Sequence, residues 1–207
     1  MAAKWLRQNT IGVDVRHGHQ LAAARTANVP SGRLVVHAHH LCAAELLAAA
    51  HLRPGHIVVG SPREVTLLAT AALPDVQMLL LTVDDSSAGR DIQRRLNDVV
   101  VAQALAQPRL RLIGLHADIS SGSAAFISAA AAVGQMIGTM ADFRERHDMV
   151  MSRISVGIDT RTVSPPDLHH HAVSIDAAVR DACHTLDFPN PSVIVSAMAP
   201  DRGRRPA

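Results

Sequence analysis

The sequence predicts an α/β fold built on a parallel sheet, either doubly wound or closed into a barrel. Two observations predict it. Seven short runs rich in Val, Ile and Leu recur along the chain, and such runs are typical of parallel strands buried on both faces. Longer segments with helical spacing separate them, the alternation from which parallel α/β sheets are built. The seven runs are 11–15, 34–37, 56–59, 78–83, 112–116, 154–157 and 193–197.

The helices are predicted from apolar spacing and from end signals. The clearest segment has apolar residues at alternating intervals of four and three positions, which places them on one helical face. They are Phe126, Ala130, Val133, Ile137 and Met140. Ser61 followed by Pro62 is typical of a helix start, because serine caps the first turn and proline fits its first position. The other predicted helices are 43–51, 62–72, 91–106 and 174–186.

Composition excludes several classes of protein. The 207 residues are 48% hydrophobic and 18% charged, which excludes a wholly disordered chain and suits one domain. With 2% aromatic residues and a net charge of +2, a nucleic-acid partner is not expected. No apolar run reaches the roughly 18–20 residues of a membrane span, so no membrane partner is expected either. Two cysteines, Cys42 and Cys183, fit a reducing cytoplasm.

Lysine is almost absent from this chain. Of the 20 Lys and Arg residues, Lys4 is the single lysine, so any covalent chemistry that needs a lysine amine must use it. Gly-rich phosphate loops of the GxGxxG or GxxxxGK[ST] type are absent as well. The sequence therefore offers no standard nucleotide-binding motif.

Histidines gather at two predicted strand ends. His17 and His19 follow one strand, and His37, His39 and His40 end or follow the next. Because the ends of parallel strands meet on one face, the two groups could together supply imidazole ligands to a metal ion. The alternative is that histidine is simply frequent in these loops, since no HExxH motif is present. A histidine-rich metal-binding module is therefore kept only as an alternative, and no metal is predicted.

Acidic residues also follow strand ends, on the face where α/β proteins build active sites. Asp84 and Asp85 follow one strand and Asp118 another, where carboxylates could bind a cation or transfer protons. Solvated loop aspartates are the alternative. Ser120 and Ser121, near His116 and Asp118, invite a hydrolase interpretation, but the GxSxG elbow is missing.

Six segments of the sequence follow one another in the order of a known family: VDVRHGHQL (13–21), RLVVHAHH (33–40), GHIVVGS (55–61), 81–83, GLHADISS (114–121) and PNPSVIVS (189–196). Their order resembles diaminopimelate decarboxylase, of the ornithine/diaminopimelate/arginine decarboxylase group, whose alanine-racemase-like barrel binds pyridoxal phosphate. The resemblance implies an incomplete TIM-type (β/α) barrel over residues 1–199. It would have about seven parallel strands with outer helices, and would lack the family's first strand and C-terminal β domain. Residues 200–207 are expected to be a flexible basic tail.

The resemblance also places a vestigial cofactor site. Its matched positions are His37, His116, Asp118, Ser121, Gly157 and Ser196. Several family features are replaced. Lys4 does not match the Schiff-base lysine, and Asp118 stands where the family has the histidine that stacks on the cofactor ring. The phosphate-binding glycine triplet becomes Gly157, Ile158 and Asp159, and the family's EPGR motif becomes SAMA at 196–199.

These replacements predict a decarboxylase-like barrel domain that is not catalytic, a pseudoenzyme or decaying paralogue with no catalytic residue and no bound cofactor. The alternative is a fragment or mis-started form of a pyridoxal-phosphate-dependent carboxy-lyase of lysine biosynthesis, which would use pyridoxal phosphate. A small anionic metabolite is a possible ligand at the strand ends.

Seven strands of an eight-stranded barrel should leave a gap between 11–15 and 193–197. Its two exposed edges would favour a partner, because unpaired strand edges tend to associate. A second copy of the chain or an intact decarboxylase paralogue is the expected partner.

Overall fold

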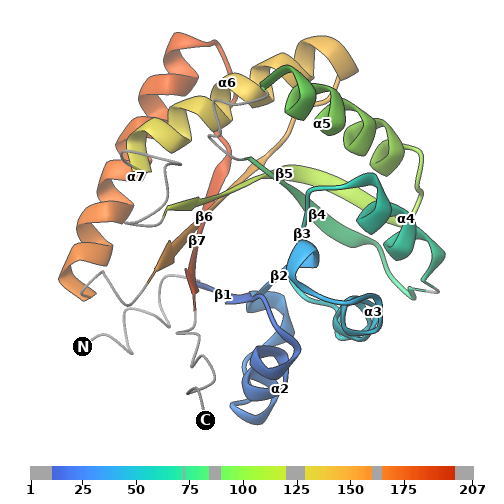
Figure 1. The fold of residues 1–207 in the computed structure, drawn as a ribbon. Coiled ribbons are helices and arrows are strands. Elements are labelled where there is room, and N and C mark those ends of the chain that lie inside the picture. Colours follow the sequence, from blue (N-terminus) through green and yellow to red (C-terminus); the bar gives the residue numbers. More distant parts are fainter. Residues whose placement is uncertain (1–10, 72, 84–89, 120–128, 160–164, 199–207) are drawn as a thin grey trace.

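The computed structural model describes residues 11–71, 73–83, 90–119, 129–159 and 165–198. Seven parallel strands form the centre, and helices lie around the outside (Figure 1). The strands are β1 (Gly12–Val15), β2 (Leu34–His37), β3 (His56–Val59), β4 (Gln77–Thr82), β5 (Leu110–Ile119), β6 (Arg153–Asp159) and β7 (Ser192–Met198). The α-helices are α2 (Gly18–Thr26), α3 (Ala43–His51), α4 (Pro62–Thr70), α5 (Arg90–Leu105), α6 (Ala129–His147) and α7 (Pro165–Thr185), with short 3-10 turns η1 (Ser31–Arg33) and η2 (Ala38–His40).

The seven strands form a closed barrel in sequence order. This confirms the predicted barrel class, but the expected gap between the first and last strands is wrong. β1 pairs directly with β7, with Gly12 opposite Ser196 and Asp14 opposite Met198. Small residues permit this closure, because a side chain on Gly12 would place its Cβ 3.0 Å from Val35 Cγ2 and 3.1 Å from Ser196 Cβ. The strand edges that suggested a partner are therefore paired with each other.

The predicted elements are found with shifted ends. The helix predicted at 43–51 coincides with α3, whereas α7 begins nine residues before its predicted start at 174. Ser61 caps α4 as expected, since its Oγ accepts from the Glu64 amide at 3.4 Å. The helix α2 is not among the predicted elements. Residues 1–10 and 199–207 lie outside the described residues, so the predicted basic tail stays a prediction.

The barrel has an outer and an inner layer of buried side chains. The outer layer packs strands against helices, and its members include Val36, Leu79 and Val156. Alternate residues of the same strands face inward, where Val35, Val58 and Leu80 form a small separate apolar cluster. Other buried inward positions are polar, and these are Asp14, His37, His116, Ser155 and Ser196. The inside of the barrel is thus apolar at one level and polar nearer the carboxyl ends of the strands.

Gly12→Val tests the closure of the barrel. Its side chain would press against Val35 and Ser196 at the β1–β7 junction, so we expect a loss of about 1–3 kcal/mol in the free energy of unfolding, typical of overpacking. Gly134→Ala in α6 is the control, because its added Cβ meets nothing within 4 Å and alanine favours a helix by about 0.5–1 kcal/mol. Urea unfolding measures both. A Gly12→Val chain as stable as the wild type would contradict direct β1–β7 pairing.

Candidate functional site

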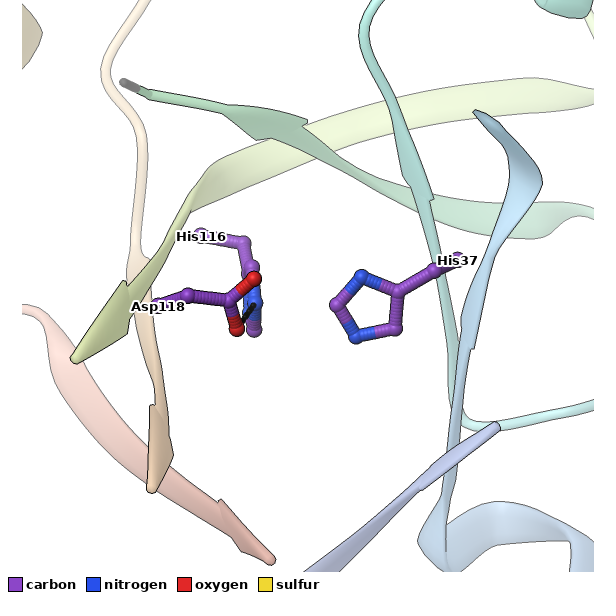
Figure 2. Close-up of side chains that lie close together, drawn as sticks. All are labelled: His37, His116 and Asp118. Carbon is purple, nitrogen blue, oxygen red and sulfur yellow. Dashed lines mark hydrogen bonds and ion pairs between the residues drawn. The ribbon is translucent and has the colours of Figure 1, made fainter. Parts of the chain in front are cut away.

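Five polar side chains meet at the carboxyl ends of β1, β2 and β5, and we call them the mouth cluster. They are Asp14, Arg16, His37, His116 and Asp118. His116 and Asp118 are two residues apart on β5, so both project from the same side of the strand. They point toward His37 of β2 across the barrel (Figure 2). The site therefore combines strands that are far apart in the sequence.

Asp14 and His37 form the deepest pair of the cluster. Asp14 Oδ1 lies 3.1 Å from His37 Nε2, and neither side chain is exposed. An ionised carboxylate only accepts hydrogen bonds, so Nε2 carries the proton that joins them. Burial, together with smaller contributions from nearby His116 and Arg16, lowers the pKa of His37 to about 4, although the hydrogen bond that His37 donates to Asp14 acts to raise the pKa. His37 is therefore a neutral imidazole at pH 7.

This pair leaves buried polar atoms without partners. Among the described residues, His37 Nδ1 and Asp14 Oδ2 have no hydrogen-bond partner, and neither does Arg16 Nε. Most buried polar atoms in proteins are paired, because leaving one unsatisfied costs about 1–3 kcal/mol. In the neutral Nε2–H tautomer, His37 Nδ1 carries a lone pair, so the mouth cluster holds two buried acceptors to which no described residue donates.

His116 links the buried pair to the rim of the barrel. Its ring lies edge-on to that of His37, with centroids 4.7 Å apart. Its Nδ1 is 3.0 Å from Ser155 Oγ, and its Nε2 is 3.1 Å from Asp118 Oδ1. Ser155 lies on β6, so this ring is fixed from two strands.

Asp118 is held as a carboxylate at the rim. Burial acts to raise its pKa, but hydrogen bonds and charge interactions with His116 and Arg16 outweigh burial and hold the pKa well below its ordinary range. Arg16 donates to Asp118 Oδ1 at 2.5 Å. The Asp118 side chain is 34% exposed, so this end of the cluster is open to solvent.

Gly157 provides the space for the cluster. A Cβ at this position would lie 2.4 Å from Asp118 Oδ1, 3.2 Å from Asp14 Oδ2 and 3.3 Å from His116 Cε1. The carboxylates of β1 and β5 therefore converge directly above this glycine of β6. Any side chain at 157 would force the cluster apart.

The loop histidines lie above the cluster and near one another. Ring centroids are 6.0 Å apart for His17 and His40, and 4.1 Å for His39 and His40. Burial and the charges of His39 and Arg16 lower the pKa of His40 to about 4. The two histidine groups do meet, as the sequence indicated. In the described part of the chain, however, the one group with ligand atoms at metal-binding spacing is His37, His116 and Asp118.

The remaining predicted positions have different outcomes. Ser196 is fully buried on β7, and its Oγ lies 3.5 Å from the Val156 carbonyl oxygen. Ser121, Asp84, Asp85 and Lys4 lie outside the described residues, as does the side chain of Asp159. Ser155 and Arg16 were missed. The available signal was strand alternation, since Ser155 is two residues before Gly157 and Arg16 two residues after Asp14.

The curated proteins that match this chain in sequence are diaminopimelate decarboxylases. Diaminopimelate decarboxylases of Mycobacterium bovis and Mycobacterium tuberculosis are each 25% identical to this chain over 223 residues. The match covers 93% of this chain and 49% of each relative, so the chain spans about half the length of the curated relatives it matches. The Mycobacterium leprae enzyme is also 25% identical, with 47% of its length covered. No family model matches the chain.

Solved structures of decarboxylases share the fold. Diaminopimelate decarboxylase from M. jannaschi superposes with a TM-score of 0.73 at 14% identity, covering 93% of this chain and 49% of that chain. The Helicobacter pylori enzyme complexed with L-lysine gives 0.68 at 15% identity, covering 94% and 52%. Ornithine decarboxylase from Entamoeba histolytica gives 0.64 at 18% identity, covering 90% and 50%. The resemblance expected from sequence is confirmed: the chain has a barrel related to that of the diaminopimelate decarboxylases.

Acid should destabilise this fold through His37. Its pKa is 6.5 ordinarily and about 4 when folded. Between these values the unfolded chain binds more protons than the folded chain, so the free energy of unfolding falls as the pH falls. The loss is complete below the folded pKa and is on the order of 3 kcal/mol for a shift of this size. We expect His37→Asn to flatten the pH dependence measured by urea unfolding.

The matched control for this measurement is His51→Gln. His51 is exposed on α3, where its Nδ1 lies 2.8 Å from the Leu47 carbonyl oxygen. This variant should keep the wild-type pH dependence. An unchanged slope in His37→Asn would show that the acid sensitivity arises elsewhere.

Proposed function

We propose that this chain is a decarboxylase-like barrel domain that acts as a non-catalytic binding module and performs no pyridoxal-phosphate chemistry. The observation that carries the proposal is the position of Asp118 over Gly157, with Oδ1 only 2.4 Å from where a side chain would begin. By the resemblance stated above, this glycine belongs to the stretch whose backbone amides approach the cofactor phosphate. In this chain a carboxylate covers it instead.

Charge also disfavours a phosphate at this place. Asp14 and Asp118 bring two carboxylates to the mouth cluster, and Arg16 is already bonded to Asp118. A phosphate placed about 4 Å from a carboxylate would be repelled by about 4 kcal/mol per charge pair at an effective dielectric constant of about 20. The residues of the mouth cluster therefore do not fit the cofactor of the related enzymes.

The scarcity of lysine also supports a non-catalytic domain. The described residues contain no lysine, and the sequence has only Lys4. A pyridoxal-phosphate enzyme relies on its protein to place the cofactor and to tune its electronics, and a Schiff-base lysine is central to both. Without a lysine among the barrel strands, the mouth cluster offers no covalent anchor.

The alternative is a fragment of a decarboxylase, which the partial coverage of the relatives favours. In that case pyridoxal phosphate would bind once the remaining half of the relatives' length is supplied. Two free cysteines, one exposed and one buried, support the cytoplasm as the proposed compartment. Among the described helices, none is long and apolar enough to cross a membrane.

We also propose a protein partner for this chain. A second copy or an intact decarboxylase paralogue stays the candidate, although the closed barrel removes the unpaired strand edges that first suggested it. A small anionic metabolite is now a weaker candidate for the mouth, because its charge would meet the same two carboxylates.

Incubation with pyridoxal phosphate tests the proposed function. We expect no stoichiometric absorbance near roughly 420 nm, where the cofactor's imine absorbs, and no borohydride-stable adduct by mass spectrometry. The urea-unfolded chain gives the background for non-specific labelling, and Lys4→Arg removes the one lysine. One adduct per folded chain that maps to Lys4 and disappears in Lys4→Arg would overturn the proposal and favour the fragment alternative.

A further inference from the structure

We propose that His37, His116 and Asp118 form a binding site for a divalent transition-metal ion of the zinc class at the mouth of the barrel. Figure 2 shows the three side chains converging from β2 and β5. The inference deepens the proposed function and rests on it in one respect, because it names a cation as the ligand that replaces a phosphate cofactor. The combination of two imidazoles and one carboxylate is common at metal sites that keep an open coordination position.

The spacing of the ligand atoms is close to what zinc requires. One ligand atom from each residue lies within 4.8 Å of the other two. Zinc bonds of about 2.0–2.2 Å place neighbouring ligands roughly 3–4 Å apart. His116 Nε2 and Asp118 Oδ1 are already 3.1 Å apart. Binding would therefore require the His37 ligand atom to be drawn closer to the other two by side-chain rotation.

Each imidazole also has the outer partner that a metal ligand needs. Metal-binding histidines usually donate their second ring N–H to a carboxylate or another acceptor, which orients the ring. His37 donates from Nε2 to Asp14, which leaves Nδ1 free to bind an ion. His116 has Ser155 Oγ at its Nδ1. The serine hydroxyl can donate or accept, so His116 can keep Nδ1 protonated and offer Nε2 to the ion.

The unsatisfied atoms give an independent reason to expect a cation. His37 Nδ1 and Asp14 Oδ2 are buried acceptors without a partner in the described part of the chain. A bound cation would satisfy the first directly and the second by charge. Two acceptors on fully buried side chains, neither of which receives a hydrogen bond, form an environment that favours a cation.

The charge balance of the site allows the ion. The mouth cluster has two carboxylates and one guanidinium. Arg16 opposes a cation and bonds the same Oδ1 of Asp118 that lies beside His116, so the ion would share this oxygen with the guanidinium or bind the second oxygen of the carboxylate. Asp118 is 34% exposed and Arg16 20%, so an ion can enter from the rim without unfolding of the barrel.

Calorimetric titration of the metal-free chain with Zn²⁺ tests this site. We expect a single strong equivalent in the wild type and a loss of at least about 100-fold in affinity for Asp118→Asn and His116→Gln. Ser155→Ala should weaken binding by about 10–100-fold, because it removes only the outer partner of His116. Co²⁺ binding gives a visible spectrum that reports the coordination geometry and should be lost in the same variants.

Two controls separate this site from the other histidines. His51→Gln removes an exposed histidine of α3 and should leave the affinity unchanged. His39→Gln combined with His40→Gln removes two loop rings above the cluster and should also preserve the strong equivalent. Thermal melts establish that each variant is folded. If His116→Gln does not fold, Asp118→Asn at the exposed rim still decides the question.

Two results would overturn the metal site. One is a wild-type chain without a strong zinc equivalent, and the other is strong binding that survives Asp118→Asn but disappears with the loop histidines. The proposed function fails separately. A stoichiometric pyridoxal-phosphate adduct on Lys4 would overturn the non-catalytic proposal whatever the zinc titration gives, whereas absent zinc binding leaves the cofactor result unchanged.

Discussion

A neutral imidazole and a carboxylate buried together inside the barrel determine the chemistry of this protein. Neither Asp14 nor His37 is exposed, so each relies on the other for the hydrogen bond that offsets the cost of leaving water. His116, Ser155, Asp118 and Arg16 extend the pair to the rim as one connected network. Removing one member would strand others in a poorly solvated interior.

Closure of the seven-stranded barrel determines where this polar network lies. Because β1 pairs with β7, the carboxyl ends of the strands enclose a small space, and Gly157 keeps that space free of a further side chain. Two cavities lined by described residues lie outside this space. A pocket of about 270 Å³ lies at the opposite ends of the strands, beside Gly12 and Arg33, and one of about 450 Å³ lies between α3 and α4. The mouth is thus a polar cluster with an open rim.

The sequence predicts most of the fold because strand burial and helix periodicity are local signals. The runs at 34–37 and 56–59 coincide with β2 and β3, whose residues are almost all buried. The start of α7 was missed because the region of Pro165 and Pro166 has little apolar periodicity. Closure was missed because it depends on how closely two distant strands approach, which the small residues Gly12 and Ser196 determine.

Individual residues of the site were predicted from the sequence, but the contacts between them were not. His37, His116 and Asp118 were singled out near predicted strand ends and again through the family pattern, and the family pattern assigned them to a cofactor. Their contact across the barrel depends on strand register, which no local signal contains. Whether they hold a cation depends on unsatisfied atoms such as His37 Nδ1, which only three-dimensional packing reveals.

The protonation state of His37 tests directly whether Asp14 and a neutral His37 form a buried hydrogen-bonded pair. Long-range ¹H–¹⁵N correlation spectra at neutral pH distinguish the imidazolium from each neutral tautomer. We expect a neutral ring that is protonated at Nε2 and bonded to Asp14, with no proton on Nδ1. An imidazolium, or a neutral ring protonated at Nδ1, would contradict the buried pair and the network built on it.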